Sequence, residues 1–323
     1  MSRARSRSAV VAEFLARRVM TLVATMFVAS VLVFGGLQLT PGDPATLLAG
    51  GHNPSQETLA AIRAEYHLDE PVWQQYLRWL SGILQWDLGR SMTFNDDVGR
   101  LISSRLTNSL FLVGYAAVFI IVVGVGIGVL AALRGGLVDR VITLVTSVGM
   151  AVPTFVAAIA LIWVFATELD WFPVFGSGTG FVDRLWHLTL PALALSGLYI
   201  AYLSRVTRSA VMAELRSEHV ETARSRGIGM ASVVRKHVLR NAVAPILTVT
   251  GLIVAGLIAG TVVAEQAFGV SGIGSLLVLA AQRQDFVVVQ DIALLMVAFF
   301  VVVNTIVDLV NVALDPRLAR TGA

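Results

Sequence analysis

The sequence has 323 residues, of which 56% are hydrophobic and 14% are charged, whereas soluble domains average about 45–50% apolar and 25% charged residues. This composition excludes an ordinary water-soluble domain, and the absence of cysteine excludes disulfides, thiol nucleophiles and thiolate metal sites. The formal net charge of +3 is small and the arginines are spread along the chain, so the charge indicates no nucleic-acid partner.

Six apolar runs are close to the length of about 20 residues that a helix needs to cross a hydrocarbon core roughly 30 Å thick. The first run follows several arginines, as in a signal peptide, but it exceeds the roughly 7–15 apolar residues of a signal peptide, so we expect a retained span. We therefore predict an all-α polytopic membrane protein with six transmembrane helices. The predicted spans are 19–39, 108–132, 141–167, 187–204, 243–264 and 287–314.

The connection between the first two spans, residues 40–107, predicts two short amphipathic helices. Asn53 is expected to cap the first helix, with Pro54 in its first turn and Gln56 placed to bond back to the cap. These helices either pack over the mouth of the bundle or dock a partner, and periodicity does not separate the two. Their apolar stripes consist of Leu59, Ile62 and Tyr66, and of Trp73, Tyr76, Leu77 and Leu80.

The distribution of lysine and arginine predicts the orientation in the membrane, because these residues are retained on the cytoplasmic side. The side of the termini carries 17 of them and the other side carries seven. We therefore place both termini in the cytoplasm. The expected organisation is an N-terminal part with the external helices (1–107), a membrane core of five spans (108–314) and a cytoplasmic tail (315–323).

The cytoplasmic connection 205–242 is strongly basic and contains two closely spaced glycines, Gly227 and Gly229. Two glycines within three residues interrupt a helix and permit a sharp turn. We expect a helix, a turn and a second helix lying across the cytoplasmic face. Charge alone leaves three other interpretations open, which are topology, binding of anionic lipid headgroups and solvation of a loop.

Polar and helix-breaking residues inside the apolar runs are further candidates. Asp308 shares one helix face with Asn304 and Asn311, and either lines a pathway or bonds to a neighbouring helix. Pro153 and Pro245 are candidate kinks or hinges. The small residues that permit close helix approach are Gly124, Gly126, Gly128, Gly256 and Gly260.

The order of residues in the basic connection resembles the cytoplasmic EAA loop of ATP-binding-cassette (ABC) importer permeases. The resemblance rests on Glu221, Thr222 and Ala223 with Gly227 following, and it implies a coupling helix seated on an ATPase. It assigns Glu221 to a polar contact, Ala223 to close approach and Gly227 to a hinge, with Arg224 and Gly229 in the same loop. Segments along the chain are similar to the dipeptide/oligopeptide permease family, among them TPGDPATLLAG, VPTF, LPALAL, YLSRVTRS and NVALDPRLAR.

This resemblance implies a type I ABC importer fold and import of short peptides across a bacterial plasma membrane. The implied partners are a second related permease, two ATPase subunits or one fused ATPase, an external solute-binding protein and membrane lipid. It also implies that Glu265 lines the outer gate. The only lysine, Lys236, follows no glycine-rich loop, so ATP and Mg are expected on the partner ATPases and no cofactor on this chain.

Three alternatives compete with this interpretation. In the first alternative, the chain is a permease of the same family that carries another small solute, such as a nickel complex. An ion-coupled transporter needs carboxylates near the middle of the membrane, and the middle thirds of the first five predicted spans contain none. An intramembrane hydrolase needs a nucleophile with its base or a metal-binding motif such as H-E-x-x-H, and the five histidines form no such motif.

Overall fold

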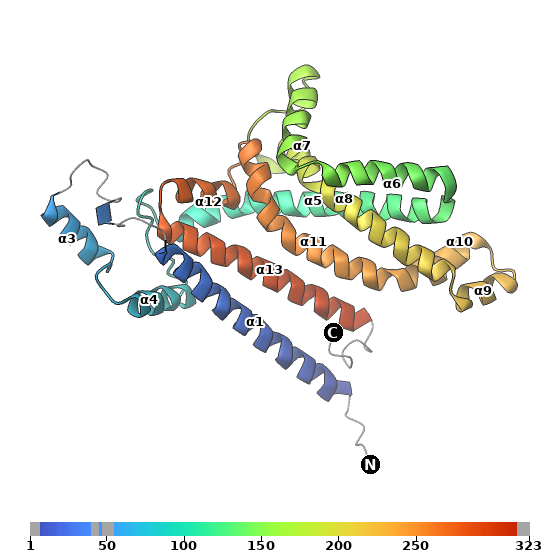
Figure 1. Cartoon of the computed structure of the whole chain (residues 1–323), viewed down its shortest axis with the longest axis horizontal. Coiled ribbons are helices and arrows are strands. Elements are labelled where there is room, and N and C mark those ends of the chain that lie inside the picture. Colours follow the sequence, from blue (N-terminus) through green and yellow to red (C-terminus); the bar gives the residue numbers. More distant parts are fainter. Residues whose placement is uncertain (1–6, 40–44, 47–54, 315–323) are drawn as a thin grey trace, which may run out of the picture.

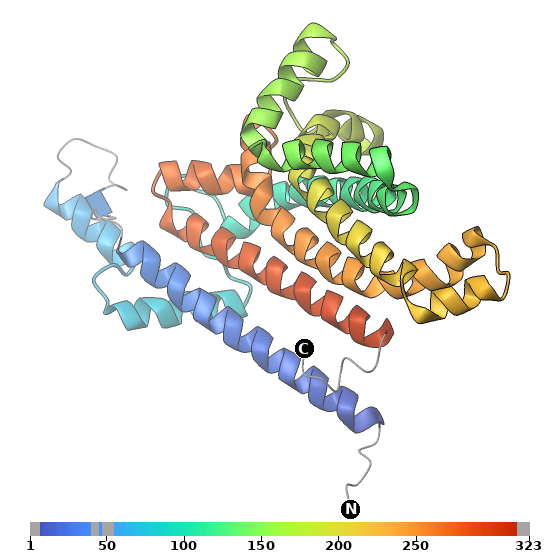
Figure 2. The same ribbon diagram turned by 45° about the vertical axis from the view of Figure 1, so that its right-hand side comes forward.

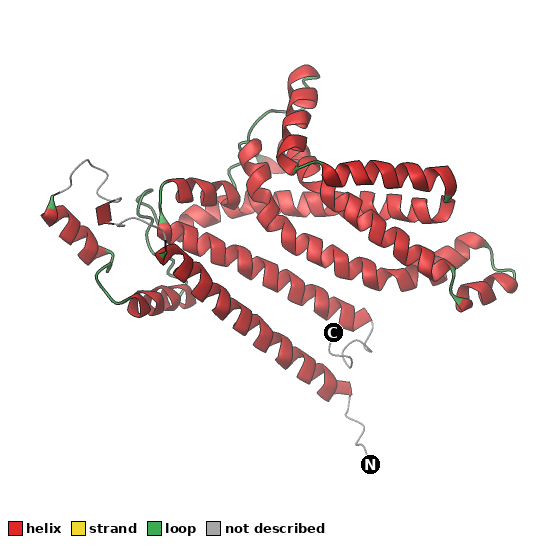
Figure 3. Cartoon of the chain, viewed as in Figure 1, coloured by secondary structure: helices red, strands yellow, loops and turns green. Residues whose placement is uncertain are grey.

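The computed structural model describes residues 7–39, 45–46 and 55–314, and Figures 1 and 3 show that these residues form an assembly of helices. The only strand-like pairing within these ranges is one antiparallel bridge between Arg90 and Asp97. The all-α expectation is confirmed.

Among the described residues, five helices are long and apolar enough to cross a membrane. Helix α1 begins and α13 ends at the same end of the bundle, here called the terminal end, and the other end is called the opposite end (Figures 1 and 2). The five helices are α1 (Arg7–Gln38), α5 (Val98–Arg134), α8 (Gly180–Leu215), α11 (Leu239–Ala267) and α13 (Phe286–Leu314).

The predicted third span is broken in the middle. Helix α6 (Gly136–Ala151) and helix α7 (Thr154–Leu161) meet at an angle of 101°, and a π-helical stretch, Ile162–Glu168, continues α7. Pro153 lies at the break, where it lacks an N–H to continue the hydrogen bonds of α6 and disfavours helical geometry in Val152. The bundle has six spans if this bent pair is counted as one.

The fourth span is longer than the sequence predicts. The prediction of 187–204 rests on hydropathy, whereas α8 is one helix from Gly180 to Leu215. Pro191 lies inside it and is buried, which membrane helices tolerate when neighbouring groups take up the freed backbone polar groups. The connection that follows α8 therefore begins after Leu215 rather than at residue 205.

Two of the short helices at the opposite end agree with the sequence and a third was missed. The amphipathic helices are α3 (Gln56–Glu65) and α4 (Val72–Leu84). The predicted cap was wrong, because the Oγ of Ser55 caps α3 by accepting a hydrogen bond from the Thr58 N–H at 3.1 Å. Asn53 and Pro54 lie outside the described residues. The missed helix, α12 (Ile273–Gln282), connects α11 to α13.

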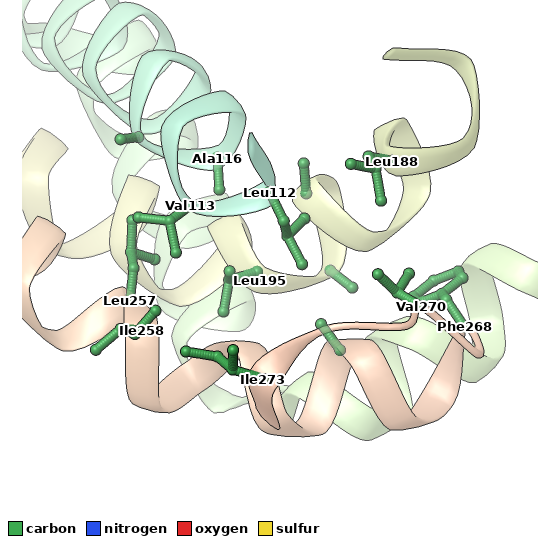
Figure 4. Packing of buried hydrophobic residues seen from close by; sticks show 14 of the residues in the cluster. Leu112, Val113, Ala116, Leu188, Leu195, Leu257, Ile258, Phe268, Val270 and Ile273 are labelled. Carbon is green, nitrogen blue, oxygen red and sulfur yellow. The ribbon is translucent and has the colours of Figure 1, made fainter. Parts of the chain in front are cut away.

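The hydrophobic core lies where α5, α8 and α11 meet. Helix α8 packs against α5, α6, α7 and α11, so it is the central helix of the bundle. Figure 4 shows side chains of α5, α8, α11 and the start of α12 pointing into one shared layer. Fully buried members of this layer include Leu112, Leu188, Leu257, Phe268 and Ile273.

Glycines on α5 set its distance from α8. A Cβ added at Gly128 would lie 2.6 Å from the carbonyl oxygen of Ser204 and 2.7 Å from the Cβ of Thr207, closer than atoms normally approach. A Cβ added at Gly126 would meet nothing within 4 Å. Gly128 therefore serves close helix packing and Gly126 does not.

We predict that Gly128→Ala lowers the free energy of unfolding by about 1–3 kcal/mol, because the new methyl group forces α5 away from α8. The matched change Gly126→Ala in the same helix leaves stability unchanged or slightly higher, since alanine favours helix over glycine. Thermal unfolding of the purified protein in detergent measures both variants. Equal melting temperatures for the two variants would contradict the packing role of Gly128.

Candidate functional site

The predicted coupling loop forms a helix, a glycine turn and a second helix. Helix α9 (Glu218–Ser225) has Glu218 and Glu221 in its first turn, where acidic side chains are favourable, and Arg224 in its last turn. The chain then reverses at Gly227, whose φ of +77° is the left-handed conformation that glycine adopts without strain. Gly229 precedes helix α10 (Met230–Val233), and a π-helical stretch, Val234–Val238, joins α10 to α11.

An apolar cluster, here called the α9 anchor, holds this loop on the bundle. Val220 and Ala223 project from one side of α9 into the cluster, and Ala223 is only 6% exposed. The small side chain of Ala223 therefore brings α9 close to the rest of this chain. The buried members of the α9 anchor are Val211, Val220, Ala223, Val233, Val238 and Ala242.

Polar contacts reinforce the α9 anchor on its exposed side. The Nδ2 of Asn241 on α11 lies 3.3 Å from the Oε2 of Glu214 on α8 and 3.1 Å from the Nε2 of His219 on α9. His219 also lies 3.3 Å from the same carboxylate of Glu214. One side chain from each of three helices thus meets at this point, and α9 is joined to both α8 and α11.

The outward side of the loop is exposed. Glu221, Thr222 and every residue from Arg224 to Ala231 are exposed, including the two larger apolar side chains of Ile228 and Met230. Figures 1 and 2 show α9 and α10 projecting from the terminal end of the bundle. The loop combines a fixed inner side with an exposed outer side of mixed charge and apolar character, which is a surface suited to a protein partner.

A second set of contacts links α8 to α6 near the terminal end, and sequence reasoning missed it. The guanidinium of Arg208 forms a bidentate salt bridge with the carboxylate of Asp139, in which Nε and Nη2 each donate to one carboxylate oxygen. The Nη2 of Arg205 donates to the Oγ of Ser147 at 2.7 Å. The sequence analysis counted both arginines only as charges of a connection, because it ended the fourth span at residue 204.

Glu265 lies inside the bundle rather than on an open surface. It is 0% exposed, and its Oε1 accepts a hydrogen bond from the Oγ of Ser109 on α5 at 2.6 Å. Its Oε2 accepts from the backbone N–H of Ser275 in the first turn of α12 at 2.9 Å. The carboxylate thus joins three helices and satisfies a free N–H at the start of α12.

The other predicted residues lie apart from one another. The Oδ2 of Asp308 lies 2.7 Å from the Nη1 of Arg18, so this carboxylate links α13 to α1. Asn311 donates to the Oγ1 of Thr248 on α11 at 3.0 Å. Pro245 lies within the continuous helix α11, whereas Pro153 lies at the break between α6 and α7.

Comparison with known proteins identifies the family. The profile of the binding-protein-dependent transport system inner membrane component matches residues 124–320, and the profile of its N-terminal region matches residues 11–108. A methionine ABC transporter, MetNI, solved in inward-facing conformations, has a similar fold, with a TM-score of 0.56 at 16% identity over 66% of this chain and 96% of that one.

Curated relatives match along nearly the whole chain. A probable peptide ABC transporter permease of Sinorhizobium fredii is 36% identical over 94% of this chain and 98% of its own length. A putative peptide transport system permease of Brucella abortus is 38% identical over 94% and 97%. The glutathione transport system permease of Escherichia coli is 34% identical over 94% and 98%. The chain therefore belongs to the family of binding-protein-dependent transport system inner membrane components and has the fold of type I ABC importer permeases.

Proposed function

We propose that the chain is one of two permease subunits of an ATP-driven importer of short peptides. The observation that carries this proposal is the exposed α9–α10 loop, which is fixed to the bundle in a chain without a nucleotide-binding loop. The peptide cargo is supported by the names of the relatives, which include peptide and glutathione permeases.

The proposal includes partners that supply energy and cargo. Separate ATPase subunits bind ATP and Mg and contact the exposed side of the loop, and an external solute-binding protein delivers the peptide to the opposite end. The terminal end then faces the cytoplasm, which agrees with the excess of lysine and arginine on that side. The chain itself catalyses no reaction in this scheme. The proposal also includes the division of the chain into an N-terminal part (1–107), a membrane core (108–314) and a C-terminal tail (315–323).

The contacts within the bundle suggest how a push on the loop reaches the spans. The α9 anchor and Asn241 join α9 to α8 and α11, so these elements move as one unit. The Arg208–Asp139 ion pair then carries α6 along with α8. Closure and reopening of the ATPase pair would in this way tilt the central helices and alternate the opening of the pathway. Asp308 acts here as the tie between α13 and α1.

We predict that Gly227→Val uncouples ATP hydrolysis from transport. A β-branched residue at a φ of +77° costs about 1–2 kcal/mol. This cost lowers the population of the native turn conformation, relative to other conformations of the loop, by roughly five- to thirtyfold. Space around Gly227 is open, so the bundle still folds. Uptake of a labelled tripeptide and ATP hydrolysis are measured on the assembled transporter in vesicles, where uptake per ATP should fall severalfold.

The control for this experiment is Gly229→Val. Gly229 has a φ of −61° and a ψ of 142°, which valine adopts without strain, and its surroundings are equally open. The membrane level of each variant is measured alongside. If Gly227→Val imports as much peptide per ATP as the control does, the turn has no role in coupling. If the unaltered complex imports no peptide, the proposed cargo is wrong.

We also propose that Glu265 stabilises the opposite end of the pathway by holding α12 against α5. Glu265→Ala leaves the Ser275 N–H and the Ser109 hydroxyl without their acceptor, which should lower the free energy of unfolding by about 1–3 kcal/mol. The exposed residue Gln282 at the end of α12 provides the control Gln282→Ala, which should unfold like the unaltered protein. Thermal unfolding in detergent measures both. A Glu265→Ala variant of normal stability with altered uptake would instead favour a direct role in the gate.

A further inference from the structure

Helix α4 has an apolar side that the described part of the chain leaves uncovered. None of its 13 residues is buried, although most of them are apolar. Trp73, Leu77 and Leu84 are all exposed and recur at intervals that place them on one side of the helix. Trp86, directly after the helix, is 91% exposed. Large apolar side chains gathered in this way mark a surface that another apolar material covers.

The neighbouring side of α4 packs on two spans at a depth inside the membrane. Tyr76 lies 2.9 Å from the Oγ of Ser30, which is eight residues before the end of the α1 span at Gln38, or roughly 12 Å along the helix axis. The Nε1 of Trp79 donates to Asp291 at 2.8 Å, and Asp291 lies five residues, or roughly 8 Å, inside the span that starts at Phe286. Helix α4 therefore lies beside the membrane-embedded part of the bundle.

Figure 1 agrees with this placement, since α4 lies alongside the last turns of α1 whereas α3 extends beyond them. The ring of Phe34 contacts both aromatic residues of α4 that face the spans, with centroids 5.4 Å from Tyr76 and 5.7 Å from Trp79. Side chains of α1 before this contact, such as Phe27 and Val31, are exposed. The uncovered side of α4 thus continues the apolar surface that α1 presents to lipid.

The polar side of α4 faces a pocket and keeps its charge away from the uncovered apolar side. Gln75, Arg78 and Gly82 line this pocket of about 610 Å³, and Trp73, Leu77 and Leu84 do not. The Nη2 of Arg78 donates to Glu70 at 2.6 Å, and this hydrogen bond holds the pKa of Glu70 below its usual range. Gln75 donates to the carbonyl oxygens of Leu68 and Glu70. Polar groups are thus segregated from the apolar stripe, as in helices that lie in a membrane interface.

We propose that α4 is an interfacial helix that lies in the membrane leaflet at the opposite end, with Trp73, Leu77 and Leu84 in contact with lipid acyl chains. The exposed ring of Trp86 then lies among the headgroups, where tryptophan is favoured. A helix of 13 residues is too short to span a bilayer and has the length of an interfacial segment. The inference depends on the insertion of this family in a membrane and not on the coupling role of α9. Only the assignment of α4 to the outer leaflet depends on the proposed orientation of the chain.

The absence of cysteine makes a site-specific probe straightforward. A nitroxide is attached at Leu77→Cys, on the uncovered apolar side, and at Arg78→Cys, an exposed position on the polar side of the same helix that lines the pocket. Ala60→Cys on α3 is the water-exposed control. Relaxation by oxygen, which concentrates in lipid, and by a water-soluble nickel chelate is measured on the assembled transporter in phospholipid vesicles. Peptide uptake by the same samples is recorded separately.

The ratio of oxygen to nickel accessibility should be severalfold higher at Leu77→Cys than at Arg78→Cys or Ala60→Cys. Equal ratios at the three positions would show that water covers the stripe and would overturn the proposal. Protection of Leu77→Cys from both reagents would show that a protein partner covers it, which would also overturn the proposal. A normal lipid contact in vesicles that import no peptide would leave the interfacial helix intact and count against the proposed function alone.

Discussion

The inability of hydrocarbon to solvate charge shapes this chain more than any other constraint. Several charged side chains of the bundle are paired across helices, as in the ion pairs Arg18–Asp308 and Arg208–Asp139. Glu265 follows the same rule, because a hydroxyl and a backbone N–H surround its carboxylate. Each pairing joins two or more helices, so satisfying the polar groups also fixes how the helices are arranged.

The same constraint keeps the exposed, charged α9–α10 loop at one end of the bundle, where the α9 anchor holds it. The anchor is apolar and small, with alanine and valine side chains, so α9 lies close to α8 and α11, as the proposed transmission of force requires. Close packing through Gly128 brings α5 next to α8. In the proposed mechanism, a push on α9 is carried by contacts that already hold the fold together.

Hydropathy and charge predicted the number of spans when the bent pair counts as one, both amphipathic helices between the first two spans, and the helix–turn–helix of the basic loop. They did not reveal the 101° break at Pro153, because proline in an apolar run is equally compatible with a mild kink, and neighbouring helices decide. They ended the fourth span too early, since Arg205 and Arg208 look like loop charges until Ser147 and Asp139 are seen beside them. Glu265 was found through resemblance, but its burial depends on α12, a helix that the sequence analysis did not predict.

The central claim is that the exposed turn after α9 seats against a separate ATPase. The most direct test places a single cysteine at Arg226, in this turn, and treats the assembled transporter with a short thiol-reactive cross-linker. A cysteine at Glu57, on α3 at the opposite end, serves as the comparison. The account predicts a cross-linked product with the ATPase from position 226, altered by ATP, and none from position 57. An ATPase product from position 57, or its absence at position 226, would contradict the account.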